Sequence, residues 1–108
     1  MPTITEDFVS FETAKLLKEK NCPDFGYSCI CDSEGNKAQT QSIIMKWLRE
    51  VHKISIEITS TGYLIDNNVE WECDIKAGHR LYFKHITNEK SFESCAEAAI
   101  RYCLENLI

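Results

Sequence analysis

The sequence predicts one α+β domain over residues 1–108, a two-layer sandwich in which three helices cover one face of a mostly antiparallel sheet of four to five strands. Two observations predict this class. Apolar residues recur every three or four positions in some segments and every second position in others, which are the periods of amphipathic helices and half-buried strands. The strand segments of the second half follow one another with short turns, which favours antiparallel pairing. The expected order is α-β-(β)-α-β-β-β-α.

The first helix is expected to begin after Ser10, because a serine hydroxyl can accept a first-turn amide that has no helical partner. It ends before Pro23, since the residue that precedes a proline disfavours helical geometry. Residues 25–36 then predict a short strand that ends in a turn at 33–36. Residues 36–40 fit either a loop or a brief second strand, and the sequence leaves both open.

The second helix is capped by Thr40 or Ser42, and its apolar residues fall at i, i+3, i+4 and i+7. These stripe residues are Ile44, Trp47, Leu48 and Val51. After His52 the period becomes two, with isoleucines at 54, 56 and 58. The pattern therefore predicts a helix that runs directly into a strand, and burial explains the change of rhythm.

Residues 69–76 alternate between apolar and charged side chains, and turn signals flank them on both sides. The inward residues are Val69, Trp71, Cys73 and Ile75, and the outward ones include Glu70, Glu72 and Asp74. This segment is expected to be the central strand, with a carboxylate-rich outer face. Ser91 caps the last helix, whose expected apolar stripe is Phe92, Cys95, Ala99, Cys103 and Leu107.

Strand register is predicted by matching inward residues across each ladder, because a slip of one residue would expose a whole apolar face. The expected pairs at the second turn are Ile75 with Leu81, Cys73 with Phe83 and Trp71 with His85. The expected pairs at the first turn are Ile58 with Ile75 and Leu64 with Val69.

Charge and termini limit the classes of function. The net charge is −5, which is too acidic for a general nucleic-acid binder. No basic flank followed by an apolar run opens the chain, and no segment approaches the length of a membrane span. The expected location is therefore the cytoplasm, with no membrane association.

The six cysteines are expected to be free thiols, mostly buried. Cys95 and Cys103 lie eight residues apart on one predicted helix, which separates them by about 12 Å, beyond disulfide reach. Cys29 and Cys31 are not followed by a second pair at zinc-finger spacing. The sequence also lacks a nucleophile signature and a glycine-rich phosphate loop. We therefore expect no enzymatic activity, no cofactor and no metal.

Three blocks of the chain carry a family resemblance. They are "FVSFETAKLLKEK", "KWLREVHKISIEI" and "SFESCAEAAIRYCLENLI". In these blocks the chain resembles a family of small proteins of gut bacteria and their phages, which pair the Trp-Leu-Arg-Glu-Val-His helix end with an Ala-X-X-Tyr-Cys-Leu-Glu-Asn-Leu-Ile tail. The family has no assigned activity, substrate or cofactor. The resemblance implies a phage or mobile-element setting, and it transfers no functional residue.

The favoured function is a small interaction module that binds a host or phage protein. Four apolar side chains fall on the outward parity of their strands and would form a partner surface if they cluster. They are Tyr63, Ile65, Tyr82 and Ile86. The alternative is a nucleic-acid accessory protein that uses the basic face of the second helix, Lys46, Arg49 and Lys53. The sequence does not specify the oligomeric state.

Overall fold

The structure is a computed structural model that describes residues 7–26, 28–65, 68–78 and 82–108, with the backbone alone at 62–65, 68, 82 and 83. Within these ranges the chain forms three helices and five strands in the predicted order, and the α+β class is confirmed. The elements are α1 (Phe11–Glu19), β1 (Cys29–Cys31), β2 (Lys37–Gln39), α2 (Gln41–Val51), β3 (Ile54–Ile65), β4 (Asn68–Ala77), β5 (Tyr82–Glu89) and α3 (Phe92–Asn106).

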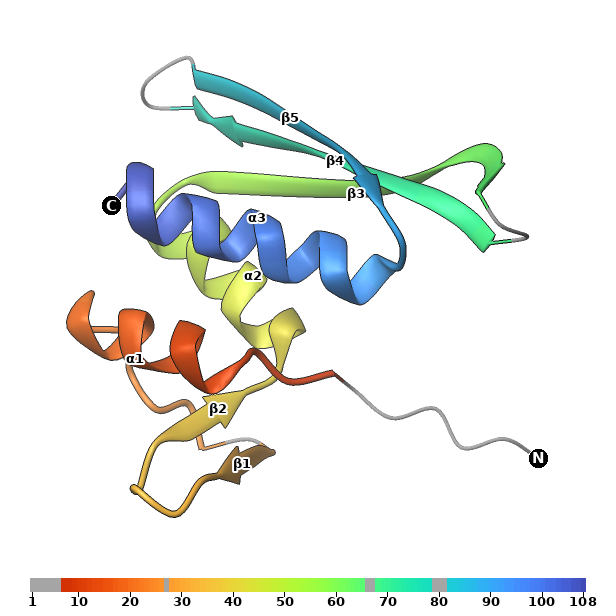
Figure 1. The fold of residues 1–108 in the computed structure, drawn as a ribbon. Helices are drawn as coiled ribbons and strands as arrows, with labels where there is room; N and C mark the ends of the chain where they lie inside the picture. Colours follow the sequence, from red (N-terminus) through yellow and green to blue (C-terminus); the bar gives the residue numbers. More distant parts are fainter. Residues whose placement is uncertain (1–6, 27, 66–67, 79–81) are drawn as a thin grey trace.

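The prediction of a single sheet with four to five strands is corrected, because the strands divide between two antiparallel sheets, a hairpin of β1 and β2 and a three-stranded sheet in the order β3-β4-β5. Helix α3 packs against all three strands of the larger sheet, and α2 packs against β3 and α3. Helix α1 packs against α3 and β2, so α1 and the hairpin lie beyond the other two helices as seen from the larger sheet (Figure 1). All three helices thus lie on one side of that sheet, and its other face is open within the described part of the chain.

Residues 37–39 form a strand, which is one of the two alternatives that the sequence leaves open. Its pairing with β1 places both strands in a hairpin that is separate from the larger sheet. Residues 37–39 pair with β1, while the segment before α1 pairs with the segment that leads into α2. The Val9 amide donates to the Gln39 carbonyl at 3.0 Å, and the Gln41 amide donates to the Asp7 carbonyl at 2.9 Å. The backbone groups of this region are therefore satisfied away from the larger sheet.

A carboxylate on α3 ties the three helices together. Glu97 accepts from the Ser10 amide and hydroxyl at 3.2 and 3.0 Å and from the Thr13 hydroxyl, at the N-terminus of α1. Its other oxygen accepts from Gln41 Nε2 of α2 at 3.3 Å. A negative charge is favourable at a helix N-terminus, so Glu97 supplements the predicted Ser10 cap. Thr40, rather than Ser42, caps α2.

The junction of α2 and β3 is built as predicted, with one correction. Lys53 adopts a left-handed backbone with φ of 59° and turns the chain from the helix into the strand. Trp47 and the other inner stripe residues are buried, but Val51 is 60% exposed. Its predicted inward position is wrong because it is the last helical residue, where the chain already turns away. The His52 ring packs edge-on against Trp47, with 4.6 Å between ring centroids.

In the central strand β4, Cys73 and Ile75 are buried as predicted, but the predicted burial of Val69 is wrong, since it is 39% exposed and lies beyond the register shift between Ser60 and Leu64. Part of the predicted register is also wrong. Leu64 pairs with Val69 as expected, but Ile58 pairs with Cys73 instead of Ile75. The predicted register of the second hairpin is wrong, and β5 presents its opposite face to the helices. The observed pairs are Trp71 with Glu89, Cys73 with Ile86, Asp74 with His85 and Ile75 with Lys84. A bulge between Trp71 and Cys73 shifts the ladder, and Asn88 of β5 has φ of 66°.

The core fills the space between the larger sheet and the helices. Cys95, Ala99 and Cys103 of α3 are fully buried, as the predicted stripe requires. The predicted burial of Phe92 is wrong, since this first residue of α3 is 40% exposed and packs edge-on against the half-buried Trp71. All six cysteines lie in the described residues, and all are free thiols. No described helix combines the length and the apolar character that crossing a membrane requires.

Candidate functional site

The open face of the three-stranded sheet gathers five charged or titratable side chains, which we call the outer-face cluster. Its members are Glu57 of β3, Glu72, Asp74 and Lys76 of β4, and His85 of β5. Strand parity places them together, because Cys73, Ile75 and Ala77 are buried toward the helices and the residues between them point to the other face. Their side chains are 32–56% exposed. The cluster is therefore accessible to a partner.

Two cations lie between the three carboxylates of the cluster. Glu57 and Asp74 are direct cross-strand neighbours, an arrangement that is unfavourable for like charges. Lys76 Nζ lies 3.3 Å from Glu57 Oε2 and relieves one side of this repulsion. His85 relieves the other, because its Nδ1 lies 2.6 Å from Asp74 Oδ1 and its Nε2 lies 3.4 Å from Glu72 Oε2.

The imidazole is the titrating member of the cluster. Its hydrogen bond with Asp74 raises the pKa of His85 above the ordinary value of 6.5, and the charge of Glu72 adds to this effect. When His85 is protonated, three carboxylates face two cations. When it is neutral, three carboxylates face Lys76 alone, so the open face becomes more acidic as the pH rises.

The outer-face cluster presents an excess of carboxylates on an exposed surface. Within the described residues, no three or more His, Cys, Asp or Glu side chains are grouped so that they could hold a metal ion. The cluster is spread over three adjacent strands, and its carboxylates come from both β3 and β4. Such a surface suits a partner that carries several positive charges in an extended segment.

The apolar partner surface that the sequence suggested is only partly described. The side chains of Tyr63, Ile65 and Tyr82 lie outside the described residues, so their clustering stays a prediction. The outward position expected for Ile86 is wrong, since it pairs with Cys73 and packs against the core. The physical reason is the register of β5, which turns Ile86 toward the helices and His85 toward the open face.

The alternative basic face lies on α2, as the helical period requires. Lys46, Arg49 and Lys53 are all exposed. Lys53 lies two residues beyond the end of α2, and its Nζ donates to the Glu50 carbonyl at 2.8 Å, so this ammonium lies against the end of the helix. Two cations beside the carboxylate of Glu50 remain, which is little positive charge for a nucleic-acid surface.

The sequence analysis missed His85 as a functional candidate. It found the acidic row of β4 from the alternation, but it paired β5 by apolar residues and so placed His85 opposite Trp71. One signal could have found it. The segment around His85 has apolar residues on both parities, and the carboxylates of β4 offer the better partners for an imidazole.

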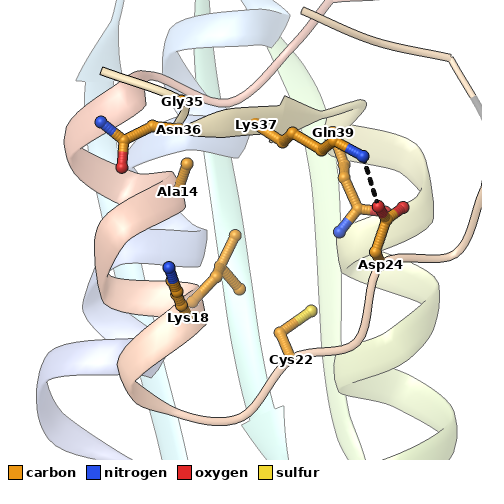
Figure 2. A pocket seen from close by; sticks show the side chains of 9 residues that line it. Ala14, Lys18, Cys22, Asp24, Gly35, Asn36, Lys37 and Gln39 are labelled. Carbon is orange, nitrogen blue, oxygen red and sulfur yellow. Dashed lines mark hydrogen bonds and ion pairs between the residues drawn. The ribbon is translucent and has the colours of Figure 1, made fainter. Parts of the chain in front are cut away.

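A concave feature lies apart from the outer-face cluster, between α1 and the β1–β2 hairpin. It is a cavity of about 240 Å³ (Figure 2). Its lining residues are Ala14, Leu17, Lys18, Cys22, Asp24, Gly35, Asn36, Lys37 and Gln39. Burial raises the pKa of the Cys22 thiol to about 11, so this thiol is uncharged at neutral pH and is a poor nucleophile.

Comparisons with known proteins identify no relative of this chain. No protein-family model matches the chain, and neither the curated proteins nor the solved structures contain a match to it.

Proposed function

We propose that the protein is a non-enzymatic interaction module that binds a basic segment of a partner protein on the open face of its three-stranded sheet. The observation that carries the proposal is the outer-face cluster. It places the carboxylates of Glu57, Glu72 and Asp74 on a sheet face that no described helix covers.

The helix-facing and open sides of the sheet support this assignment in different ways. The helix-facing side is consumed by the core, with Cys73 and Ile75 at most 1% exposed. The open side contributes little to folding, because exposed ion pairs are worth only about 0–1 kcal/mol each. Its carboxylates are therefore available for a partner without loss of the fold.

The charge of the face selects the chemistry of the partner. Excess carboxylate repels nucleic acid and attracts lysine and arginine side chains, and arginine can bind a carboxylate with two parallel hydrogen bonds. The family resemblance implies a phage or mobile-element setting, so we propose a host or phage protein with a basic segment as the partner. The basic face carries less positive charge to offer a second partner, because Lys53 donates to the Glu50 carbonyl at the end of α2.

A charge-matched pair of variants tests the proposal. The probe is a labelled oligoarginine peptide, and binding is measured by fluorescence anisotropy at low and at physiological salt. The variant Glu57→Gln with Glu72→Gln removes two carboxylates from the open face and leaves the Asp74–His85 pair in place. The control, Glu19→Gln with Glu50→Gln, makes the same change of net charge on exposed positions of α1 and α2.

We expect the open-face variant to bind the peptide about tenfold more weakly, since each exposed ion pair contributes up to about 1 kcal/mol. The control should bind like the unmodified protein. Equal weakening in both variants would show that only net charge matters and would refute the assignment. Binding of a labelled DNA duplex in preference to the peptide would refute it as well.

A further inference from the structure

We infer that the cavity between α1 and the β1–β2 hairpin binds a small organic monocarboxylate, a ligand with one apolar ring or short chain and a single carboxylate. The cavity lies on the opposite side of α2 and α3 from the open sheet face (Figure 1). This inference is therefore independent of the proposed protein-binding function.

The floor of the cavity is apolar. Ala14 and Leu17 of α1 line it, and both belong to the core at 8% and 4% exposure. Cys22 adds a half-buried thiol that stays neutral because burial raises its pKa to about 11. An uncharged thiol beside aliphatic groups behaves as a small hydrophobic surface. The floor therefore suits the apolar part of a ligand.

Hydrogen bonds inside the protein hold the opposite wall in place. Gln39 donates from Nε2 to the Pro23 carbonyl at 3.0 Å, and its Oε1 accepts from the Phe25 amide at 3.1 Å. Asn36 donates to Asp32 Oδ2 at 2.9 Å. The side-chain amides of Gln39 and Asn36 are therefore fixed by hydrogen bonds within the protein.

Lys18 is the lining group best placed to bind an anion. On the opposite wall Lys37 Nζ pairs with Asp24 Oδ2 at 2.9 Å (Figure 2). Near the hairpin turn Lys15 pairs with Glu34 at 3.7 Å. Lys18 makes no ion pair with any residue in the described ranges. The Asp24 and Glu34 carboxylates are thus already paired with lysines, and the Asp32 carboxylate accepts from the Asn36 amide and side chain. The Lys18 ammonium remains at the cavity for one negative charge.

The volume limits the ligand further. Pockets for drug-sized molecules usually enclose about 300–1,000 Å³, so a cavity of about 240 Å³ suits a smaller molecule. A nucleotide is too large, and inorganic phosphate has no apolar part to use the floor. One apolar group with one carboxylate matches both the size and the single cation.

Benzoate is a suitable probe, and amide chemical shifts recorded by nuclear magnetic resonance during its titration are a suitable measurement. Benzyl alcohol has the same ring without the charge and serves as the ligand control. Lys18→Gln removes the proposed anion partner from an exposed position, so the fold should be retained. Lys46→Gln on α2 is the matched variant, because it removes an exposed lysine away from the cavity.

The inference predicts saturable shift changes at cavity-lining amides, including those of Ala14, Leu17, Lys18 and Lys37. The Lys18→Gln variant should bind benzoate at least about threefold more weakly, as loss of an exposed ion pair allows, and Lys46→Gln should bind it normally. Scattered changes that do not saturate would overturn the inference. Equal affinity in the two variants, or equal affinity for benzyl alcohol, would also overturn it.

Discussion

The two sides of strand β4 differ completely although their residues alternate along one chain segment. Cys73, Ile75 and Ala77 face the helices and are 0–1% exposed. Glu72, Asp74 and Lys76 face outward, with side chains 32–50% exposed. Burial of apolar area by the first set stabilises the fold, whereas the exposed charges of the second set contribute little to its stability. The comparison teaches that one side of the sheet holds the fold and the other is free to carry function.

The largest expected effect is on the helix-facing side. Ile75→Ala should lower the free energy of unfolding by about 2–5 kcal/mol, because it removes buried methyl groups and leaves a cavity. Glu72→Gln, on the open side, should change it by less than about 1 kcal/mol. Urea unfolding of both variants measures the difference. Similar losses in the two variants would contradict the division of roles between the sides.

Thiol reactivity should separate buried from accessible positions by a wide margin. Cys31 is exposed, whereas Cys95 and Cys103 are fully buried and burial raises the pKa of each thiol to about 12. The thiolate is the reactive form, so Cys31 should be alkylated in the native protein while the two buried thiols react only on unfolding. Mass spectrometry of timed iodoacetamide reactions checks this. Early labelling of Cys95 would show that α3 does not seal the core.

The alternation in the sequence was enough to predict both sides of β4 but not those of β5. In β4 every second residue is apolar, so only one parity can face the helices, although Val69 near the start of the strand is 39% exposed. The segment 80–86 has apolar residues on both parities, and the bulge beside Trp71 leaves no mark in the composition. The exposure of Val51 was equally hidden, since it depends on the left-handed turn at Lys53, a position that glycine usually takes.

A smaller effect is expected on the titration of the open side. Asp74→Asn should lower the pKa of His85 toward 6.5, because the hydrogen bond with Asp74 is the main cause of its increase. Imidazole chemical shifts followed against pH measure this value. An unchanged pKa in the variant would mean that His85 and Asp74 do not interact in solution.

The smallest expected effect is on stability. A pKa that folding raises stabilises the protein fully below the unfolded value of 6.5, and this contribution disappears as the pH rises through the folded value. His85→Gln should therefore be destabilising at about pH 5.5 and nearly neutral at about pH 9. Urea unfolding at the two pH values tests the sign. A larger loss at the higher pH would contradict the pairing with Asp74.

The pH dependence of oligoarginine binding tests the central claim most directly, that the open face of the sheet is a binding surface for a basic segment. Deprotonation of His85 leaves Lys76 as the cluster's remaining cation, while arginine keeps its charge throughout the range. The unmodified protein should therefore bind the peptide more tightly as the pH rises from about 6 to about 9. His85→Gln should bind with a constant affinity that matches the high-pH value of the unmodified protein. An affinity that falls with rising pH, or the same pH dependence in His85→Gln, would contradict the account.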